Sequence, residues 1–166
     1  MFSARFEHFW FGVAFLLAYL WIKRQRQEGG LLLHPLALAV ALPVLYLGSA
    51  LPDWDIKLLG IGAHRNPLFH SAAAYFCLAY LWRRIGLEQA VHNAAGVRLK
   101  IAAQVGFALG LCSHLVLDIL QYGDVRWLSG STLDKAWLGG NAAILGLAAW
   151  YPQRARRRAL GLRSTG

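Results

Sequence analysis

The feature that most constrains this chain is a series of long apolar stretches separated by short connections rich in lysine and arginine. The clearest is LLLHPLALAVALPVLYLGSAL at residues 31–51, which contains no lysine, arginine or acidic residue. A helix that crosses a membrane needs about 20 consecutive, mostly apolar residues. The pattern therefore predicts an all-α fold, a polytopic membrane helical bundle with four or five transmembrane helices.

Composition agrees with this prediction, because 57% of the residues are hydrophobic and only 15% are charged. Soluble domains average about 45–50% and 25%. We expect residues 1–151 to form a single transmembrane domain and residues 152–166 to form a basic cytoplasmic tail. Pro43 should kink the second stretch or end it a turn early. The last stretch is short and glycine-rich, so four spans remain an alternative to five. The predicted spans are 6–22, 31–51, 67–82, 101–120 and 136–151.

The net charge of +9 indicates a membrane surface rather than nucleic acid as the partner. The basic residues fall between and after the apolar stretches, as juxtamembrane charges do, and positive residues accumulate in the cytoplasm. With five spans, twelve basic residues lie on one side and five on the other. We therefore expect a multi-pass protein of the inner (plasma) membrane, with its N-terminus outside and its C-terminus in the cytoplasm. The twelve are Lys23, Arg24, Arg26, Arg83, Arg84, Arg98, Lys100, Arg154, Arg156, Arg157, Arg158 and Arg163.

Three short segments hold most of the unusual polarity. They are GSALPDWD at 48–55, HRNPLFHS at 64–71 and HLVLD at 114–118. With five spans, all three lie at the same outer face of the membrane. Because the positions of the spans were not chosen to produce this result, it independently supports one shared site.

The third segment gives the most detailed prediction. His114 and Asp118 are four residues apart and share one face of a helix. Steps of four back from His114 reach Gly110, Gly106 and Ala102, and small residues at this spacing allow a neighbouring helix to approach closely. The ionisable pair should therefore point into the bundle. A histidine and an aspartate in hydrocarbon are costly unless they are paired or bind something.

The other two segments supply matching donors. Asp53 and Asp55 point the same way in an extended or turn segment, and adjacent carboxylates repel unless a cation lies between them. His64 and His70 enter the third span. Arg65 lies beside them, and its guanidinium suits a phosphate, a carboxylate or a developing oxyanion. We therefore name Arg65 as a candidate catalytic residue.

Three imidazoles and three carboxylates without a thiolate suit a divalent metal such as Zn or Mn. Because a catalytic zinc keeps about three protein ligands, either two ions share the set or some members orient the others or act as a general base. A buried polar network without metal is the alternative. We expect His8, His92, Asp124 and Asp134 to be solvated or among headgroups, and His34 to lie at a membrane boundary. The predicted ligands are Asp53, Asp55, His64, His70, His114 and Asp118.

These residues resemble the motifs of the membrane-bound, metal-dependent hydrolase family of YdjM-like proteins, which are LexA-regulated inner-membrane proteins. The family shows L-P-D-x-D after an apolar helix, here at 51–55, then an H-R segment ending in H-S, here at 64–71. A late H-x-x-x-D follows, here at 114–118. The resemblance covers about residues 31–128 and implies a metal-dependent hydrolase. The family usually carries an earlier histidine, for which His34 is the candidate.

The activity that we expect is hydrolysis at a metal centre at the outer membrane–water interface. A lipid or another membrane-associated ester or phosphoester is the natural substrate at headgroup depth. One alternative is a small non-enzymatic subunit of a larger membrane complex, whose histidines serve packing or ligate a tetrapyrrole. Another is a metal carrier, although a carrier needs polar residues at successive depths.

Overall fold

The computed structural model describes residues 2–26, 32–60, 64–84, 94–121, 125 and 131–159, and every regular element within them is a helix. The all-α prediction is therefore confirmed, and all five apolar stretches contribute a helix. The helices are α1 (Phe2–Gln25), α2 (Pro35–Ala50), α3 (Trp54–Leu59), α4 (Ala73–Arg84), α6 (Ala94–Gln121) and α7 (Ser131–Ala159).

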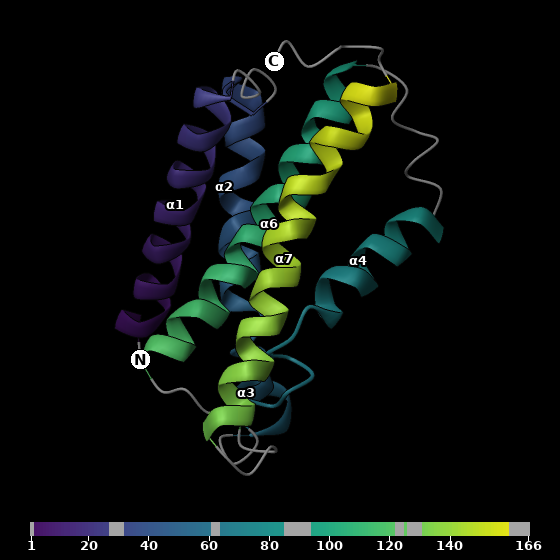
Figure 1. Ribbon diagram of the computed structural model, residues 1–166. Helices are drawn as coiled ribbons and strands as arrows, with labels where there is room; N and C mark the ends of the chain where they lie inside the picture. The colour runs from purple at the N-terminus through teal and green to yellow at the C-terminus, as the bar shows by residue number, and fades with distance from the viewer. Residues whose placement is uncertain are drawn as a thin grey trace.

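Helix α6 forms the centre of the bundle and packs against α1, α2 and α7 (Figure 1). Consecutive long helices run in opposite directions, so α2 and α6 both end toward the lower part of the view, whereas α4 begins about half-way up (Figure 1). The short helix α3 lies at this same end. Helix α4 stands apart from the other long helices (Figure 1).

The contact between α2 and α6 depends on small residues, as the sequence predicts. A Cβ atom at Gly106 would collide with the carbonyl oxygen of Ala41, and one at Gly110 would collide with that of Leu45. Gly48 on α2 approaches the carbonyl oxygen of Phe107 in the same way. Backbone atoms inside a helix cannot rotate away, so only glycine permits this separation of the two helices.

Helix α2 begins at Pro35 because His34 caps it. The His34 Nδ1 atom accepts a hydrogen bond from the Leu36 N–H at 3.3 Å, and proline suits the first helical position. The helix continues through Pro43 to Ala50. The proline therefore does not shorten the helix by a turn.

The third predicted span begins too early, because residues 67–72 are turns and α4 starts at Ala73. The Oδ1 atom of Asn66 accepts a hydrogen bond from the Leu68 N–H at 2.9 Å, which favours a turn over a helix. The hydroxyl of Ser71 then accepts from the Ala73 N–H at 3.2 Å and caps α4. Local side-chain acceptors therefore keep His70 outside the helix.

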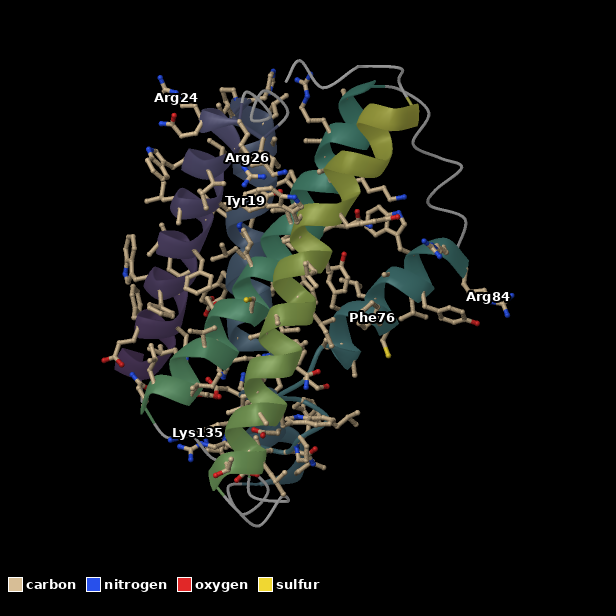
Figure 2. The ribbon with its side chains drawn as sticks, viewed as in Figure 1. Tyr19, Arg24, Arg26, Phe76, Arg84 and Lys135 are labelled. Carbon is tan, nitrogen blue, oxygen red and sulfur yellow. The ribbon has the colours of Figure 1, made fainter. Side chains whose placement is uncertain are left out.

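At the end of the bundle away from α3, aromatic and basic side chains join α1 to α7 (Figure 2). The Tyr19 hydroxyl donates to the carbonyl oxygen of Ala149 at 3.0 Å. The ammonium of the fully buried Lys23 lies 3.6 Å from the centroid of the Trp150 ring, and the guanidinium of Arg26 lies 5.2 Å from it. The contact with the Trp150 ring helps to compensate for the burial of the Lys23 charge, whereas Arg26 is exposed.

Among the described helices, residues Ala95–Gln121 of α6 are long and apolar enough to cross a membrane, and α2 is a shorter apolar helix. Helix α7 extends to Ala159, so part of the segment predicted as a basic tail continues a helix. The number of spans remains a prediction.

Candidate metal centre

The six predicted donors come together at the end of the bundle that carries α3. Asp53 and Asp55 follow α2, and His64 and His70 lie in the connection before α4. His114 and Asp118 occupy the last two turns of α6. The antiparallel arrangement of the helices explains this convergence, because each segment lies at a helix end that faces the same way.

The centre of the cluster is one carboxylate oxygen between two imidazoles. The Oδ2 atom of Asp118 lies 3.3 Å from the Nε2 atom of His70 and 3.3 Å from the Nε2 atom of His114. Asp53 lies immediately before α3, and its Oδ1 atom is 3.9 Å from the same His114 Nε2 atom. Asp53 precedes α3 without capping it through its side chain, so its carboxylate remains available to the cluster.

Backbone carbonyl groups fix the orientation of both imidazoles. The Nδ1 atom of His114 lies 2.7 Å from the carbonyl oxygen of Ser49, and that of His70 lies 3.2 Å from the carbonyl oxygen of Asn66. A carbonyl oxygen only accepts, so each Nδ1 carries the hydrogen and donates it. In the neutral form of each ring, the Nε2 atom then presents a lone pair toward Asp118. Histidines that bind metals are commonly held in this way.

The fully buried Asp55 holds the connection that carries the histidines. One of its oxygens accepts from the Asn66 N–H at 3.0 Å and lies 3.5 Å from the Nδ1 atom of His70. The other oxygen lies 3.3 Å from the Nδ1 atom of His64. Both oxygens therefore face the segment 64–70, which is the geometry of a group that positions ligands.

Arg65 lies between the two residues that Asp55 holds. Its φ of 65° is in the left-handed region, which is uncommon for a residue other than glycine. The contacts of Asp55 with His64 and Asn66 on either side maintain this conformation. A backbone strained by about 1–3 kcal/mol persists only where its surroundings over-determine it, and such residues cluster at functional sites.

The structure adds one donor that the sequence interpretation missed. His8 was expected among headgroups, yet it is only 6% exposed, and its ring stacks on that of His114 with centroids 4.0 Å apart. His34 caps α2 at the opposite end of a 16-residue helix, about 24 Å away, so it is not the earlier histidine of the site. His8, on α1, occupies that role in space.

The donors form two groups that each have the spacing of a metal site. His8, His114 and Asp118 each offer one ligand atom, and these atoms lie within 4.8 Å of one another; Asp53, His64 and His70 form a second such group. Buried atoms of this cluster have no hydrogen-bond partner, namely His8 Nδ1, His70 Nε2, His114 Nε2 and Asp118 Oδ2. Unpaired lone pairs that converge in a buried space suit a cation, so the residues present fit a metal.

Helix α7 holds the connection from its other side. The indole N–H of Trp137 donates to the carbonyl oxygens of Pro67 at 3.3 Å and His70 at 3.2 Å. The Oδ1 atom of Asn141 accepts from the Ala72 N–H at 2.9 Å. Neither residue was predicted to contribute. A lone asparagine in the apolar sequence GGNAAILG was the available signal, since polar side chains join helices in membranes.

The other polar residues singled out from the sequence differ in their burial, as do the members of the cluster. Asp134 was expected to be solvated, but it is 3% exposed in the first turn of α7. His92 and Asp124 lie outside the described residues. Asp53 and His64 are the most exposed members of the cluster, with side chains 14% and 23% exposed, so the centre opens to its surroundings beside them.

Comparison with families of known proteins gives a match. The family profile described as YdjM inner membrane protein matches residues 4–154, which is most of the chain. No curated protein and no solved structure matches the chain. The matched region contains every donor of the cluster, including His8.

Proposed function

Because the chain belongs to the YdjM inner membrane protein family, we propose that its histidine and aspartate cluster is the metal centre of a membrane-embedded hydrolase. The substrate that we propose is a lipid or another membrane-associated ester or phosphoester. The observation that carries this proposal is the meeting of two imidazole lone pairs at Asp118 Oδ2. The lone pairs of neutral imidazoles and a carboxylate repel at this distance, and a metal ion or a proton between them removes the repulsion.

The donor chemistry supports zinc or manganese. Both groups contain only imidazole and carboxylate donors, which are borderline and hard ligands. The separation of the donors into two groups of three supports two ions, with the charge of Asp118 near both. Bound divalent metal would polarise the scissile ester and activate water.

The residues around the centre would transfer protons, bind the substrate and position the ligands. Water adds to the acyl or phosphoryl centre while its proton passes to a general base; the ester bond breaks, and the departing oxygen takes up a proton to give an alcohol and an acid. Where a single ion is held by His8, His114 and Asp118, Asp53 and His64 are available to move this proton, because they are the exposed members of the cluster. Arg65 would hold an anionic group of the substrate, and Asp55 would position His64 and His70.

The geometry favours this function over ligation of a tetrapyrrole. A histidine that binds a tetrapyrrole needs open space beside its ring. His114 instead has His8 stacked on one face and two carboxylates beside its Nε2 atom. The cluster lies at one end of the bundle, whereas a carrier needs polar residues at successive depths.

Metal content tests the proposal directly. Protein purified without a histidine tag should hold stoichiometric zinc or manganese by elemental analysis. His114→Ala should remove the ion held by His8, His114 and Asp118, so the metal content should fall by at least half. His34→Ala is the matched control and should retain the metal, since His34 lies at the other end of α2. Equal metal content in both variants would contradict the proposal.

We further propose that the metal centre faces outward, with the N-terminus outside and the C-terminus in the cytoplasm. Arg24 and Arg26 lie at the end of the bundle opposite Lys135, in accord with the charge asymmetry (Figure 2). Lys57 and Arg24 are both exposed at these opposite ends.

In a background where Ser replaces Cys77 and Cys112, a membrane-impermeant maleimide should label Lys57→Cys on intact cells. It should label Arg24→Cys only after lysis; the reverse pattern would invert the orientation.

A further inference from the structure

An apolar cavity of about 530 Å³ lies beside the metal centre. This volume falls within the range of about 300–1,000 Å³ that is typical of small-molecule sites. Its walls come from α2, α3, α4 and α6, and aliphatic and aromatic side chains form most of them. They include Val44, Leu47, Leu51, Trp54, Leu78 and Phe107. We name this cavity the acyl groove.

The acyl groove begins next to the metal centre. Leu51 and Trp54 line it, and these residues bracket Pro52 and Asp53. Trp54 is 41% exposed, whereas the side chain of Asp55 that follows it is fully buried in the cluster. One short segment therefore sends carboxylates into the metal centre and apolar side chains into the groove.

The length of the groove matches one leaflet of a membrane. From Val44 to Leu51 along α2 the lining extends over eight residues, or seven steps of about 1.5 Å and about 10 Å in all. The hydrocarbon core of a bilayer is about 30 Å thick, so one leaflet is about 15 Å. A chain that enters beside Trp54 would therefore extend through most of the leaflet nearest the metal centre.

The lining of the acyl groove suits a hydrocarbon chain, because nearly all of it is apolar. A single flexible hydrocarbon chain fits both the volume and the apolar walls. Because the protein belongs to an inner membrane family, such chains surround it.

We propose that the acyl groove holds one acyl chain of a membrane lipid whose headgroup ester lies at the metal centre. This inference rests on the proposed function and specifies its substrate class as a lipid. Asp53 and His64, the exposed members of the cluster, would face the headgroup, and the apolar walls would align the ester with them. The groove thus acts as a specificity site for long-chain substrates.

Alkylphosphonates of two chain lengths test the groove. Ala103 lines it on α6 and Ala79 on α4, whereas Ala143 is exposed on α7 outside it. In metal-loaded protein, Ala103→Trp should weaken binding of dodecylphosphonate at least about tenfold, the effect of losing the burial of two methylene groups. Binding of ethylphosphonate should not change. Ala143→Trp should change neither, and Ala79→Trp replaces Ala103→Trp if the latter does not fold. Isothermal titration calorimetry measures these affinities.

The outcomes separate this inference from the proposed function. If ethylphosphonate binds but filling the groove leaves dodecylphosphonate binding unchanged, the groove proposal is overturned and the metal centre is not. If neither phosphonate binds metal-loaded wild-type protein, the proposed function fails. Cross-linking in vesicles then tests whether the groove holds an acyl chain. The probe is a phosphatidylethanolamine that carries a diazirine in one acyl chain. Cross-links to residues 44–54 and 74–82 that decrease in Ala103→Trp support it; cross-links that do not change overturn it.

Discussion

Replacing Asp118 with asparagine is expected to leave the protein folded while lowering its affinity for zinc or manganese more than about 100-fold. The Oδ2 atom of Asp118 is 3.3 Å from the Nε2 atoms of both His70 and His114. The amide keeps the shape of the side chain but removes its negative charge. Changes to groups that only orient ligands already cost about 10- to 100-fold in metal affinity, so loss of a direct ligand should cost more. Equilibrium dialysis followed by elemental analysis measures the change.

The same variant distinguishes a metal centre from a buried polar network. In a network without metal, wild-type protein would hold no stoichiometric ion. With a proton in place of a metal, the amide would leave a buried imidazolium without its carboxylate, and Asp118→Asn would lower the melting temperature with no change in metal content. Glu7→Gln is the matched control, because Glu7 is exposed beside the buried His8 and its loss removes the same charge. This control should bind metal as the wild type does.

Gly110→Ala is expected to destabilise the protein by about 1–3 kcal/mol, the usual cost of inserting a methyl group where no space exists. The new Cβ atom would collide with the Leu45 carbonyl oxygen and lie 2.9 Å from the Ser49 nitrogen. Separation of α2 from α6 would also move the Ser49 carbonyl group away from the Nδ1 atom of His114. A lower melting temperature in detergent and a lower metal content should therefore occur together.

Gly140→Ala is the same substitution at a position with free space, and it is not expected to destabilise the protein. A Cβ atom at Gly140 meets nothing within 4 Å, and alanine is favoured over glycine inside a helix by about 0.5–1 kcal/mol. The melting temperature should stay constant or rise, and the metal content should not change. Equal destabilisation by the two substitutions would show that the contact between α2 and α6 is looser than the structure describes.

Local patterns made a large part of the site predictable. His114 and Asp118 are one helical turn apart, so their shared face follows from helical geometry alone. Gly106 and Gly110 extend that face, and the structure confirms their role in packing. The family resemblance drawn from three short motifs is confirmed by the match over residues 4–154. The convergence of the motifs followed from counting apolar stretches, because antiparallel helices return every second connection to the same end.

Contacts between distant segments were not predictable in the same way. His8 precedes His114 by more than one hundred residues, and nothing near it in the sequence is acidic except Glu7. Its expected place among headgroups was wrong because α1 packs against α6 and buries it. The different roles of Asp53 and Asp55 were likewise not predictable from the sequence. Both were predicted as ligands, but both oxygens of Asp55 face residues 64–70, and only the fold could show this.

By itself, the sequence determined the apolar helices, their small-residue contacts and the set of imidazole and carboxylate donors. These properties depend on residue type and on spacing within one turn or one helix. The tertiary structure decided which histidine completes the cluster, which backbone carbonyl groups orient its rings and where an apolar cavity adjoins it. The physical reason is that hydrogen bonds to backbone carbonyl groups and cavities between helices depend on the distance between segments, which no local pattern specifies.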